Sequence, residues 1–125
     1  MEQIVVAKVS EIPPGRRKIV VPFRGLAGIG VFNVNGRFYA VRNICPHRGG
    51  PLCTGELSGR VMANGPPSSR ESTILIDRVG EVLRCPWHQW AFEISTGRCL
   101  LDPQIRVATY PVRIEGHDVV VEFED

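Results

Sequence analysis

Short apolar runs separated by Gly, Pro and Asn dominate the chain, and no window shows a sustained helical period. Residues 4–9 and 17–21 are two such runs, and Pro13-Pro14-Gly15 lies between them. Short runs bounded by turn residues are typical of strands, whereas frequent Gly and Pro disfavour helices. The pattern therefore predicts an all-β fold.

Three segments have the pattern of β-hairpins. Residues 31–34 and 37–41 are predicted strands, and Asn35-Gly36 between them suits a type I′ turn. Residues 73–84 predict a second hairpin that turns near Gly80, and residues 109–123 predict a third that turns near Gly116 and His117. The polar segment 58–71, with its Gly, Pro and Ser, predicts an exposed loop.

Length and charge limit the class of protein. A chain of 125 residues is enough for one domain, so we expect a single domain over residues 1–125. Its 15 basic and 13 acidic residues give a formal charge of +2, and no basic run exceeds Arg16-Arg17-Lys18, which disfavours nucleic acid as a partner. No apolar stretch approaches the roughly 20 residues that span a bilayer, and the N-terminal residues lack a signal-peptide pattern. We therefore expect a soluble, cytoplasmic protein with no membrane partner.

Two similar motifs, CPHRGGPL at residues 45–52 and CPWHQWAF at residues 85–92, contain the candidate chemistry. Each follows a predicted strand, and each combines a cysteine with a histidine: Cys45 with His47, and Cys85 with His88. Loops at strand ends present side chains from a rigid base, and Pro and Gly restrict the shape of such loops. In a reducing compartment, cysteines are more often metal ligands or free thiols than disulfides. We therefore predict one metal centre with two thiolates and two imidazoles.

A set of two cysteines and two histidines fits two kinds of metal centre. Zinc binds such a set as a tetrahedral structural site. A [2Fe–2S] cluster binds it with the cysteines on one iron and the histidines on the other. The four residues alone leave both open.

The residues around the ligands resemble those of Rieske ferredoxins and of the Rieske domains of ring-hydroxylating oxygenases. Those families have Cys-x-His-Arg-Gly-x-x-Leu, then Cys-Pro-(Trp/Tyr)-His-x-Trp-x-Phe followed by Thr-Gly. The matching residues here are Cys45, His47, Arg48, Gly49 and Leu52, then Cys85, Pro86, Trp87, His88, Trp90, Phe92, Thr96 and Gly97. The similarity covers nearly the whole chain. It has two departures: 37 residues, positions 48 to 84, separate His47 from Cys85, which is more than in compact members, and Gln89 stands where many members have Gly.

The resemblance implies a fold, a cofactor and a function. The fold is a small antiparallel β-sandwich with an inserted two-loop cluster-binding subdomain, at about residues 43–91, between basal sheets at about 1–42 and 92–125. One [2Fe–2S] cluster per chain is bound by Cys45, His47, Cys85 and His88, and no residue is catalytic. The protein is expected to pass single electrons from a reductase to an oxygenase-type acceptor rather than to act as an enzyme alone. The alternatives are a colourless, zinc-stabilised β interaction module, and an iron–sulfur redox sensor or accessory subunit of a reductase.

High-potential Rieske proteins have an extra cysteine in each loop, joined as a disulfide, and a serine that donates a hydrogen bond to the cluster. This pair is absent here, so the resemblance implies the low-potential branch. Other residues are predicted to be structural. Cys53 and Cys99 are predicted to be buried thiols, with a redox pair as the alternative, and His117 is predicted to be a solvated turn residue. Trp87, Trp90 and Phe92 are predicted to cover the cluster and the core. Arg16, Arg17, Lys18 and Arg48 are predicted to be solvated charges, with docking of an acidic partner as the alternative.

Overall fold

The computed structural model describes residues 2–20, 28–46, 49–64, 73–87, 89–102 and 104–123, and of residues 59–64 and 73–79 it describes the backbone alone. Three antiparallel sheets make up this part of the protein. Its helical segments are single 3-10 turns, Val9–Glu11 (η1) and Leu52–Thr54 (η2), so the all-β prediction is confirmed. No helix among the described residues has the length and apolar character needed to cross a bilayer.

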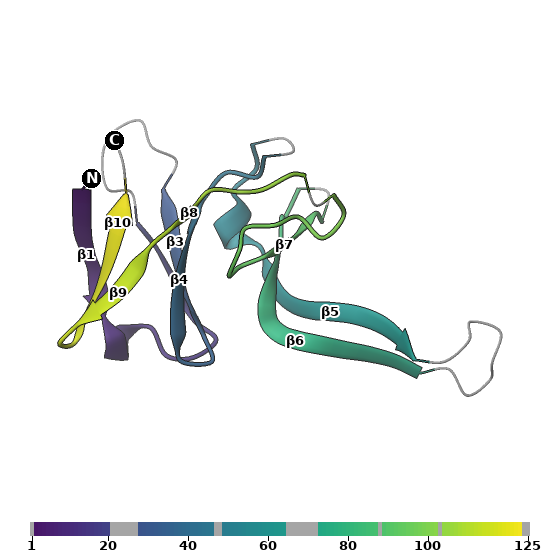
Figure 1. Ribbon diagram of the computed structural model, residues 1–125, viewed down its shortest axis with the longest axis horizontal. Helices are drawn as coiled ribbons and strands as arrows, with labels where there is room; N and C mark the ends of the chain where they lie inside the picture. The colour runs from purple at the N-terminus through teal and green to yellow at the C-terminus, as the bar shows by residue number, and fades with distance from the viewer. Residues whose placement is uncertain are drawn as a thin grey trace.

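Two of the sheets form a sandwich, which occupies the left of Figure 1. The first sheet has the strand order β1-β10-β9, and the second has the order β2-β3-β4-β8. The bounds of the first sheet are Glu2–Lys8 for β1, Asp118–Phe123 for β10 and Val112–Glu115 for β9. Those of the second are Arg17–Val20 for β2, Ile29–Val34 for β3, Arg37–Arg42 for β4 and Thr109–Tyr110 for β8.

Two of the three predicted hairpins are present. β3 pairs with β4 across Asn35 and Gly36, whose φ angles of 53° and 92° are both positive, as a type I′ turn requires. β9 pairs with β10 across the turn at Gly116 and His117. Thr109–Tyr110 does not continue β9 but pairs with β4, because Pro111 lies between them and has no N–H for a ladder.

The central strand β3 is buried along its whole length because both faces of its sheet are covered. One face packs against the first sheet, in a core of Val6, Ala7, Ile12, Ile29, Val31, Ala40, Val119, Val121 and Phe123. The opposite face packs against the cysteine-containing segments, in a core of Phe32, Val34, Val41, Cys45, Leu52, Cys53, Leu83, Cys85, Phe92, Ile94, Cys99 and Val107. The second sheet is therefore the middle layer, on which the candidate site is built.

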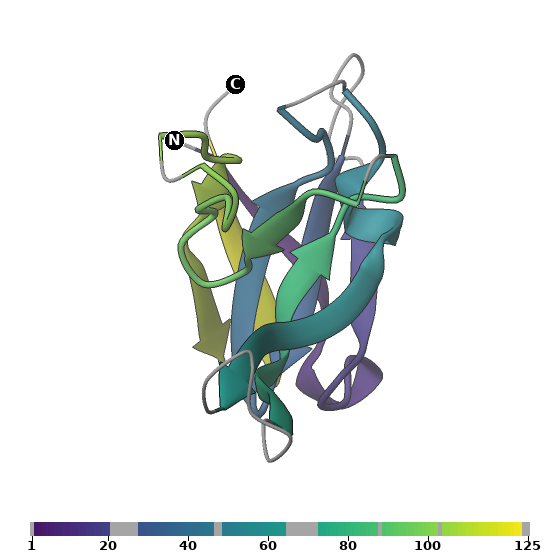
Figure 2. The same cartoon turned by 90° about the vertical axis from the view of Figure 1, so that its right-hand side faces the viewer.

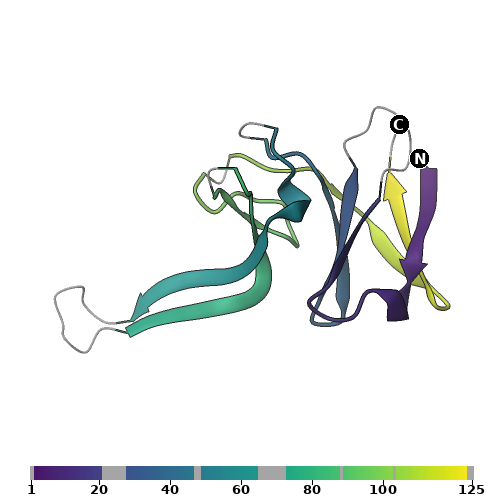
Figure 3. The same ribbon diagram turned by 180° about the vertical axis from the view of Figure 1, so that it is seen from behind.

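The third sheet has the order β5-β6-β7, with β5 at Glu56–Asn64, β6 at Thr73–Arg84 and β7 at Ala91–Glu93. The hairpin predicted for residues 73–84 is wrong, because these residues form one strand that pairs with β5. β5 itself occupies much of the segment predicted to be an exposed loop, and residues 65–72 lie outside the described residues. The β5–β6 ribbon extends away from the sandwich, as Figures 1 and 3 show.

Gly80 lies in an irregularity of the β5–β6 ladder rather than in a turn. Ser58 pairs with Val82 and Arg60 pairs with Asp77, so residues 78–81 of β6 face residue 59 alone. Gly80 has a φ of +83°, a conformation that glycine adopts without steric cost. The sequence predicted a turn at Gly80 because a bulge and a turn need the same backbone freedom.

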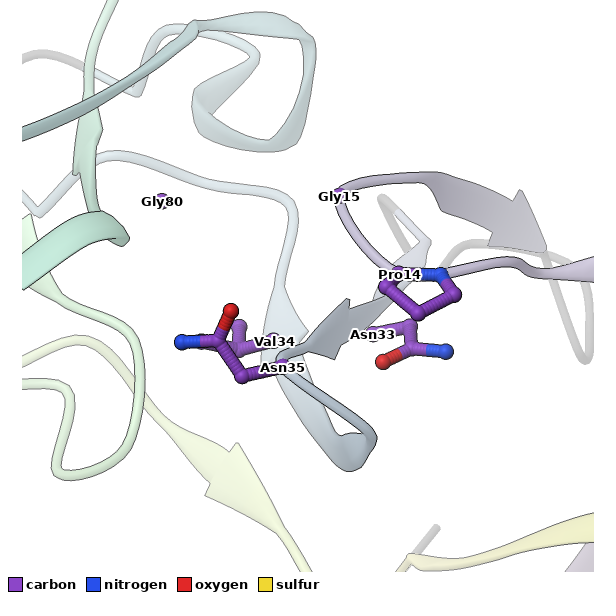
Figure 4. A pocket seen from close by; sticks show the side chains of 6 residues that line it. All are labelled: Pro14, Gly15, Asn33, Val34, Asn35 and Gly80. Atoms are coloured by element: carbon purple, nitrogen blue, oxygen red, sulfur yellow. The ribbon is translucent and has the colours of Figure 1, made fainter.

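Beside this bulge lies a pocket of about 260 Å³, lined by Pro14, Gly15, Asn33, Val34, Asn35 and Gly80 (Figure 4). The side-chain amide of Asn33 is already hydrogen-bonded there: its Nδ2 donates to the Ile12 carbonyl and its Oδ1 accepts from the Gly36 N–H, both at 2.8 Å. The Asn33 side chain therefore has a structural role, because both its Nδ2 and its Oδ1 already have a hydrogen-bond partner within the protein.

Candidate metal centre

The candidate site is made by two loops, the first at residues 45–52 after β4 and the second at residues 85–90 after β6. Figure 2 shows the segments after these two strands on the same end of the molecule. The side chains of Cys45 and Cys85 are both buried. His47 and His88, like Arg48, lie outside the described residues, so the structure places the two predicted thiolates and leaves the two predicted imidazoles as a prediction.

The two loops have the same backbone hydrogen bonds. The Cys45 N–H donates to the Gly50 carbonyl at 2.8 Å, and the Gly49 N–H donates back to the Cys45 carbonyl at 2.7 Å. In the second loop the Cys85 N–H donates to the Trp90 carbonyl at 2.8 Å, and the Gln89 N–H donates to the Cys85 carbonyl at 3.1 Å. Each cysteine therefore begins a six-residue segment, residues 45–50 or 85–90, whose ends are joined by a backbone hydrogen bond.

This shared geometry shows what the departure at Gln89 costs the backbone. The residue four positions after each cysteine has a left-handed backbone, with φ +76° at Gly49 and φ +59° at Gln89. Glycine adopts this conformation freely, whereas a side chain at such a position has a steric cost. Many Rieske proteins have Gly at the second position, and the backbone of this chain accounts for that preference.

The thiols of Cys45 and Cys85 lie beside each other, and both cysteines are free of disulfides. Burial raises the pKa of the Cys85 thiol, a hydrogen bond from the Trp87 backbone lowers it, and the neighbouring Cys45 raises it again. Two adjacent buried thiolates repel each other and are poorly solvated, so a cation between them is needed to stabilise both. Buried, paired and disulfide-free thiols thus fit a thiophilic metal centre.

No group of three or more metal-ligating side chains occurs within residues 2–20, 28–46, 49–64, 73–87, 89–102 and 104–123. These ranges include Cys45 and Cys85 but not their predicted histidine partners. The thiol pair is therefore the part of the donor set that the structure describes.

Close backbone approach joins the two loops below the cysteines. Gly55 follows η2, and a Cβ on it would lie 1.7 Å from the carbonyl oxygen of Arg84, the residue before Cys85. Only glycine permits this approach. Sequence reasoning missed Gly55, because its partner is distant along the chain and no local pattern marks the contact.

Arg17 attaches the first loop to the sandwich. Its Nη1 donates to the Cys53 carbonyl at 2.9 Å and to the Gly55 carbonyl, and its guanidinium lies 5.6 Å from the centre of the Phe32 ring. Arg17 was predicted to be a solvated charge. That prediction is wrong, because its guanidinium uses its donors on two backbone carbonyls of the loop.

Lys18 was also predicted to be a solvated charge, but its Nζ donates to the Val6 carbonyl at 2.8 Å. Cys53, Cys99, His117 and Phe92 are as expected. Cys53 is buried, its Sγ donates to the Val41 carbonyl at 3.3 Å, and burial raises its pKa to about 12. Cys99 is buried in the same core, and His117 is exposed in its turn. Phe92 is in the core and Trp90 packs against it, whereas Trp87 is 49% exposed.

Comparison with known proteins agrees with this geometry. The model of the Rieske [2Fe-2S] domain family matches residues 2–111. The ferredoxin component of the naphthalene 1,2-dioxygenase system of Pseudomonas aeruginosa is 30% identical over 96 residues, which are 76% of this chain and 72% of that protein. The biphenyl dioxygenase ferredoxin subunit of Pseudomonas sp. (strain KKS102) is 30% identical over 116 residues, 92% of this chain and 86% of that one.

Among solved structures, a chain in the complex of reduced oxygenase and oxidized ferredoxin of carbazole 1,9a-dioxygenase is similar over 95% of this chain and 91% of its own length. Its TM-score is 0.70 and its sequence identity is 25%. The all-β sandwich with two cysteine loops over its middle sheet defines an iron–sulfur protein of the Rieske class. The chain belongs to the Rieske [2Fe-2S] domain family, and its cofactor is a [2Fe–2S] cluster. The zinc alternative is thereby set aside.

Proposed function

We propose that this protein is a one-electron carrier that accepts electrons from a reductase and delivers them to an oxygenase-type acceptor. The observation that supports this most is the pair of buried, adjacent thiols of Cys45 and Cys85 in a chain whose relatives are ferredoxin components of dioxygenase systems. The absence of a second metal set in the sequence, once His47 and His88 are used, agrees with a carrier rather than an oxygenase.

Within this proposal, Cys45 and Cys85 hold one iron, and His47 and His88 hold the other. The same backbone turn at both cysteines supports the assignment, because it presents two equivalent sulfurs from two facing loops. When bound, the cluster supplies one-electron redox chemistry at a potential set by its ligands and by hydrogen bonds to its sulfurs.

The chain's own residues have three tasks in this function. Burial of Cys45 and Cys85 excludes water from the sulfurs. The Trp87 backbone N–H donates to the Cys85 sulfur and favours its thiolate form. The middle sheet below the loops restrains their movement, which keeps the reorganisation accompanying electron transfer small.

A cytoplasmic location is part of the proposal. All four cysteines, Cys45, Cys53, Cys85 and Cys99, are free in the structure. Free thiols are typical of reducing compartments. Fractionation of cells that produce the tagged protein tests this, and recovery in an extracytoplasmic fraction would contradict it.

The function is tested on protein purified without oxygen. We expect about two irons and two sulfides per chain, and after dithionite reduction an electron paramagnetic resonance signal of low average g from unequal His and Cys ligation. The protein should then reduce a Rieske oxygenase in the presence of a ferredoxin reductase and NADH. Colourless protein with one zinc would contradict the cofactor, and a loaded cluster that no reductase reduces would contradict the carrier role alone.

The ligand assignment is tested residue by residue. Changing Cys45, His47, Cys85 or His88 to Ala should abolish the visible spectrum or alter it grossly, because each substitution removes a coordinating atom. Cys53→Ser and Cys99→Ser are the matched controls, and their folded protein should keep the wild-type spectrum. Loss of the spectrum in either control would show that the wrong cysteines had been assigned.

A further inference from the structure

Trp87 has an unusual environment for a large aromatic residue beside a metal centre. It belongs to the second loop and is 49% exposed, yet its indole lies against Gly50 of the first loop. A Cβ built on Gly50 would be 2.9 Å from Cγ and Cδ2 of Trp87 and 3.1 Å from Cε3. The indole is therefore in contact with the backbone of Gly50, at a place where no other residue type leaves room for it.

This contact crosses between the loops, whereas the backbone hydrogen bonds of Cys45 and Cys85 each stay within one loop. Gly50 is also the residue whose carbonyl accepts from the Cys45 N–H. A side chain that rests on Gly50 thus contacts the turn that positions Cys45. Trp87 is only two residues from Cys85. Its contact with Gly50 therefore links the turn of Cys45 to the turn of Cys85.

Trp87 also touches the second cysteine through its backbone. Its N–H donates to the Cys85 sulfur. If the second loop shifts once the indole no longer rests on Gly50, this N–H shifts with it, because Trp87 belongs to that loop. Hydrogen bonds to cluster sulfurs raise the reduction potential.

We propose that Trp87 is a positioning residue, and that its indole, seated on Gly50, holds the two cysteine loops at the separation that retains the [2Fe–2S] cluster. The inference rests on the proposed ligand set and goes beyond it, since neither Trp87 nor Gly50 coordinates iron. Its consequence is that Gly50 and Trp87 act as one unit. A methyl group on Gly50 should do the same damage as loss of the indole.

The test is a double-mutant cycle on the purified holoprotein, with Trp87→Ala, Gly50→Ala and the double variant. The readouts are the half-life of the visible spectrum in excess chelator, and the midpoint potential from a spectroscopic titration. Each single change should shorten the half-life by about tenfold, a barrier change of ~1.4 kcal/mol, and lower the midpoint potential. The double variant should be no worse than the single ones, because both remove the same contact.

Two further variants separate positioning from a general loss of stability. Trp87→Phe keeps an aromatic ring on Gly50 and should restore most of the half-life and the potential. Ile114→Ala removes a side chain of similar exposure, 46%, from β9 of the sandwich and should match the wild type in both readouts.

Multiplied half-life losses in the double variant, or a Gly50→Ala protein that matches the wild type, would overturn the proposal. A wild-type protein that binds no cluster would instead contradict the proposed function, so the two failures are distinguishable. Circular dichroism of each variant identifies any that does not fold. If Trp87→Ala does not fold, Trp87→Leu, which keeps a large side chain without a ring, takes its place: a half-life well below that of Ile114→Ala supports the proposal, and a half-life equal to it overturns the proposal.

Discussion

At the residue scale, the two loops differ in how well their residues suit a shared backbone. Gly49 and Gln89 occupy equivalent positions, and both have positive φ. No atom lies within 4 Å of a Cβ built on Gly49, so the cost of a side chain there comes from backbone conformation alone. The exposed side chain of Gln89 has that cost already.

We therefore predict opposite effects of two exchanges. Gln89→Gly should stabilise the protein by about 0.5–1 kcal/mol, which is the relief of left-handed strain less the greater entropy of an unfolded glycine. Gly49→Ala should destabilise it by about the same amount. Thermal unfolding of the holoprotein measures both, and a shift of equal sign in the two variants would contradict the shared geometry.

Cys53 gives a prediction about chemical reactivity. Burial raises its pKa from 9.0 to about 12, against smaller lowering effects of a Gly30 backbone hydrogen bond and of Arg17. At pH 8 its thiolate fraction should therefore be about a thousandfold below that of an ordinary thiol. Iodoacetamide should label Cys53 at least that much more slowly in folded protein than in denaturant, as followed by mass spectrometry.

The raised pKa of Cys53 also makes the stability of the folded protein depend on pH. The unfolded chain loses the Cys53 proton near pH 9.0, whereas the folded chain keeps it to about pH 12. The contribution of Cys53 to stability is thus complete below pH 9.0 and falls as pH rises through that window. In Cys53→Ala this part of the alkaline loss should be missing, and an unchanged alkaline profile would contradict the assignment.

At the element scale, the site depends on where η2 meets the end of β6. Gly55 brings the first loop against the Arg84 carbonyl, and Arg17 of β2 holds the same segment from the side of the sandwich. Cys45 and Cys85 face each other because these two elements are joined just below them. The joint combines this backbone contact and these charge-assisted hydrogen bonds with the buried core that contains Leu52 of η2 and Leu83 of β6.

Gly55→Ala should accordingly be among the most damaging small changes in the chain. Its Cβ would lie 1.7 Å from the Arg84 oxygen, so the backbone must move, at a cost of about 3 kcal/mol or more. We expect a lower melting temperature and a large fall in iron content. Gly116→Ala is the control, since its added Cβ meets no atom within 4 Å and it lies in the β9–β10 turn. Equal iron loss in both variants would argue against the joint.

At the scale of the whole molecule, the fold places the cysteine loops over a sheet that is itself covered on its other face. Rigid layers below the loops and a half-exposed Trp87 above them suit a centre that exchanges electrons without rearranging. The potential of such a centre follows from its ligands and from hydrogen bonds to sulfur.

We predict a midpoint potential near the low end of the Rieske range, about −150 mV rather than +300 mV. Neither loop has a second cysteine, so no disulfide joins the two loops: the first continues with Gly49 and Gly50, and Trp87 lies between Cys85 and His88. The second loop also has no serine to donate a hydrogen bond to the cluster. Protein-film voltammetry at pH 7 measures this potential. A value near the high end would mean that other donors to the cluster sulfurs replace the missing serine.

Local patterns predicted much of the fold. The hairpin at Asn35-Gly36 and the turn at Gly116 were predictable because turn residues and flanking apolar runs are adjacent in sequence. The β5–β6 pairing was not, since Gly80 looks like a turn until Thr73–Arg84 is seen to pair with Glu56–Asn64. A bulge and a turn need the same glycine, and only the partner strand distinguishes them.

The sequence by itself determined the all-β class, the family, and the two motifs with their paired cysteines and histidines, because each of these is recorded in residues that are close neighbours along the chain. The tertiary structure alone decided that Cys45 lies beside Cys85, that Gly55 touches Arg84, that Arg17 binds loop carbonyls and that Trp87 rests on Gly50. The physical reason is that these contacts join residues that are distant in sequence. They exist only once the sheets have packed and brought the two loops together.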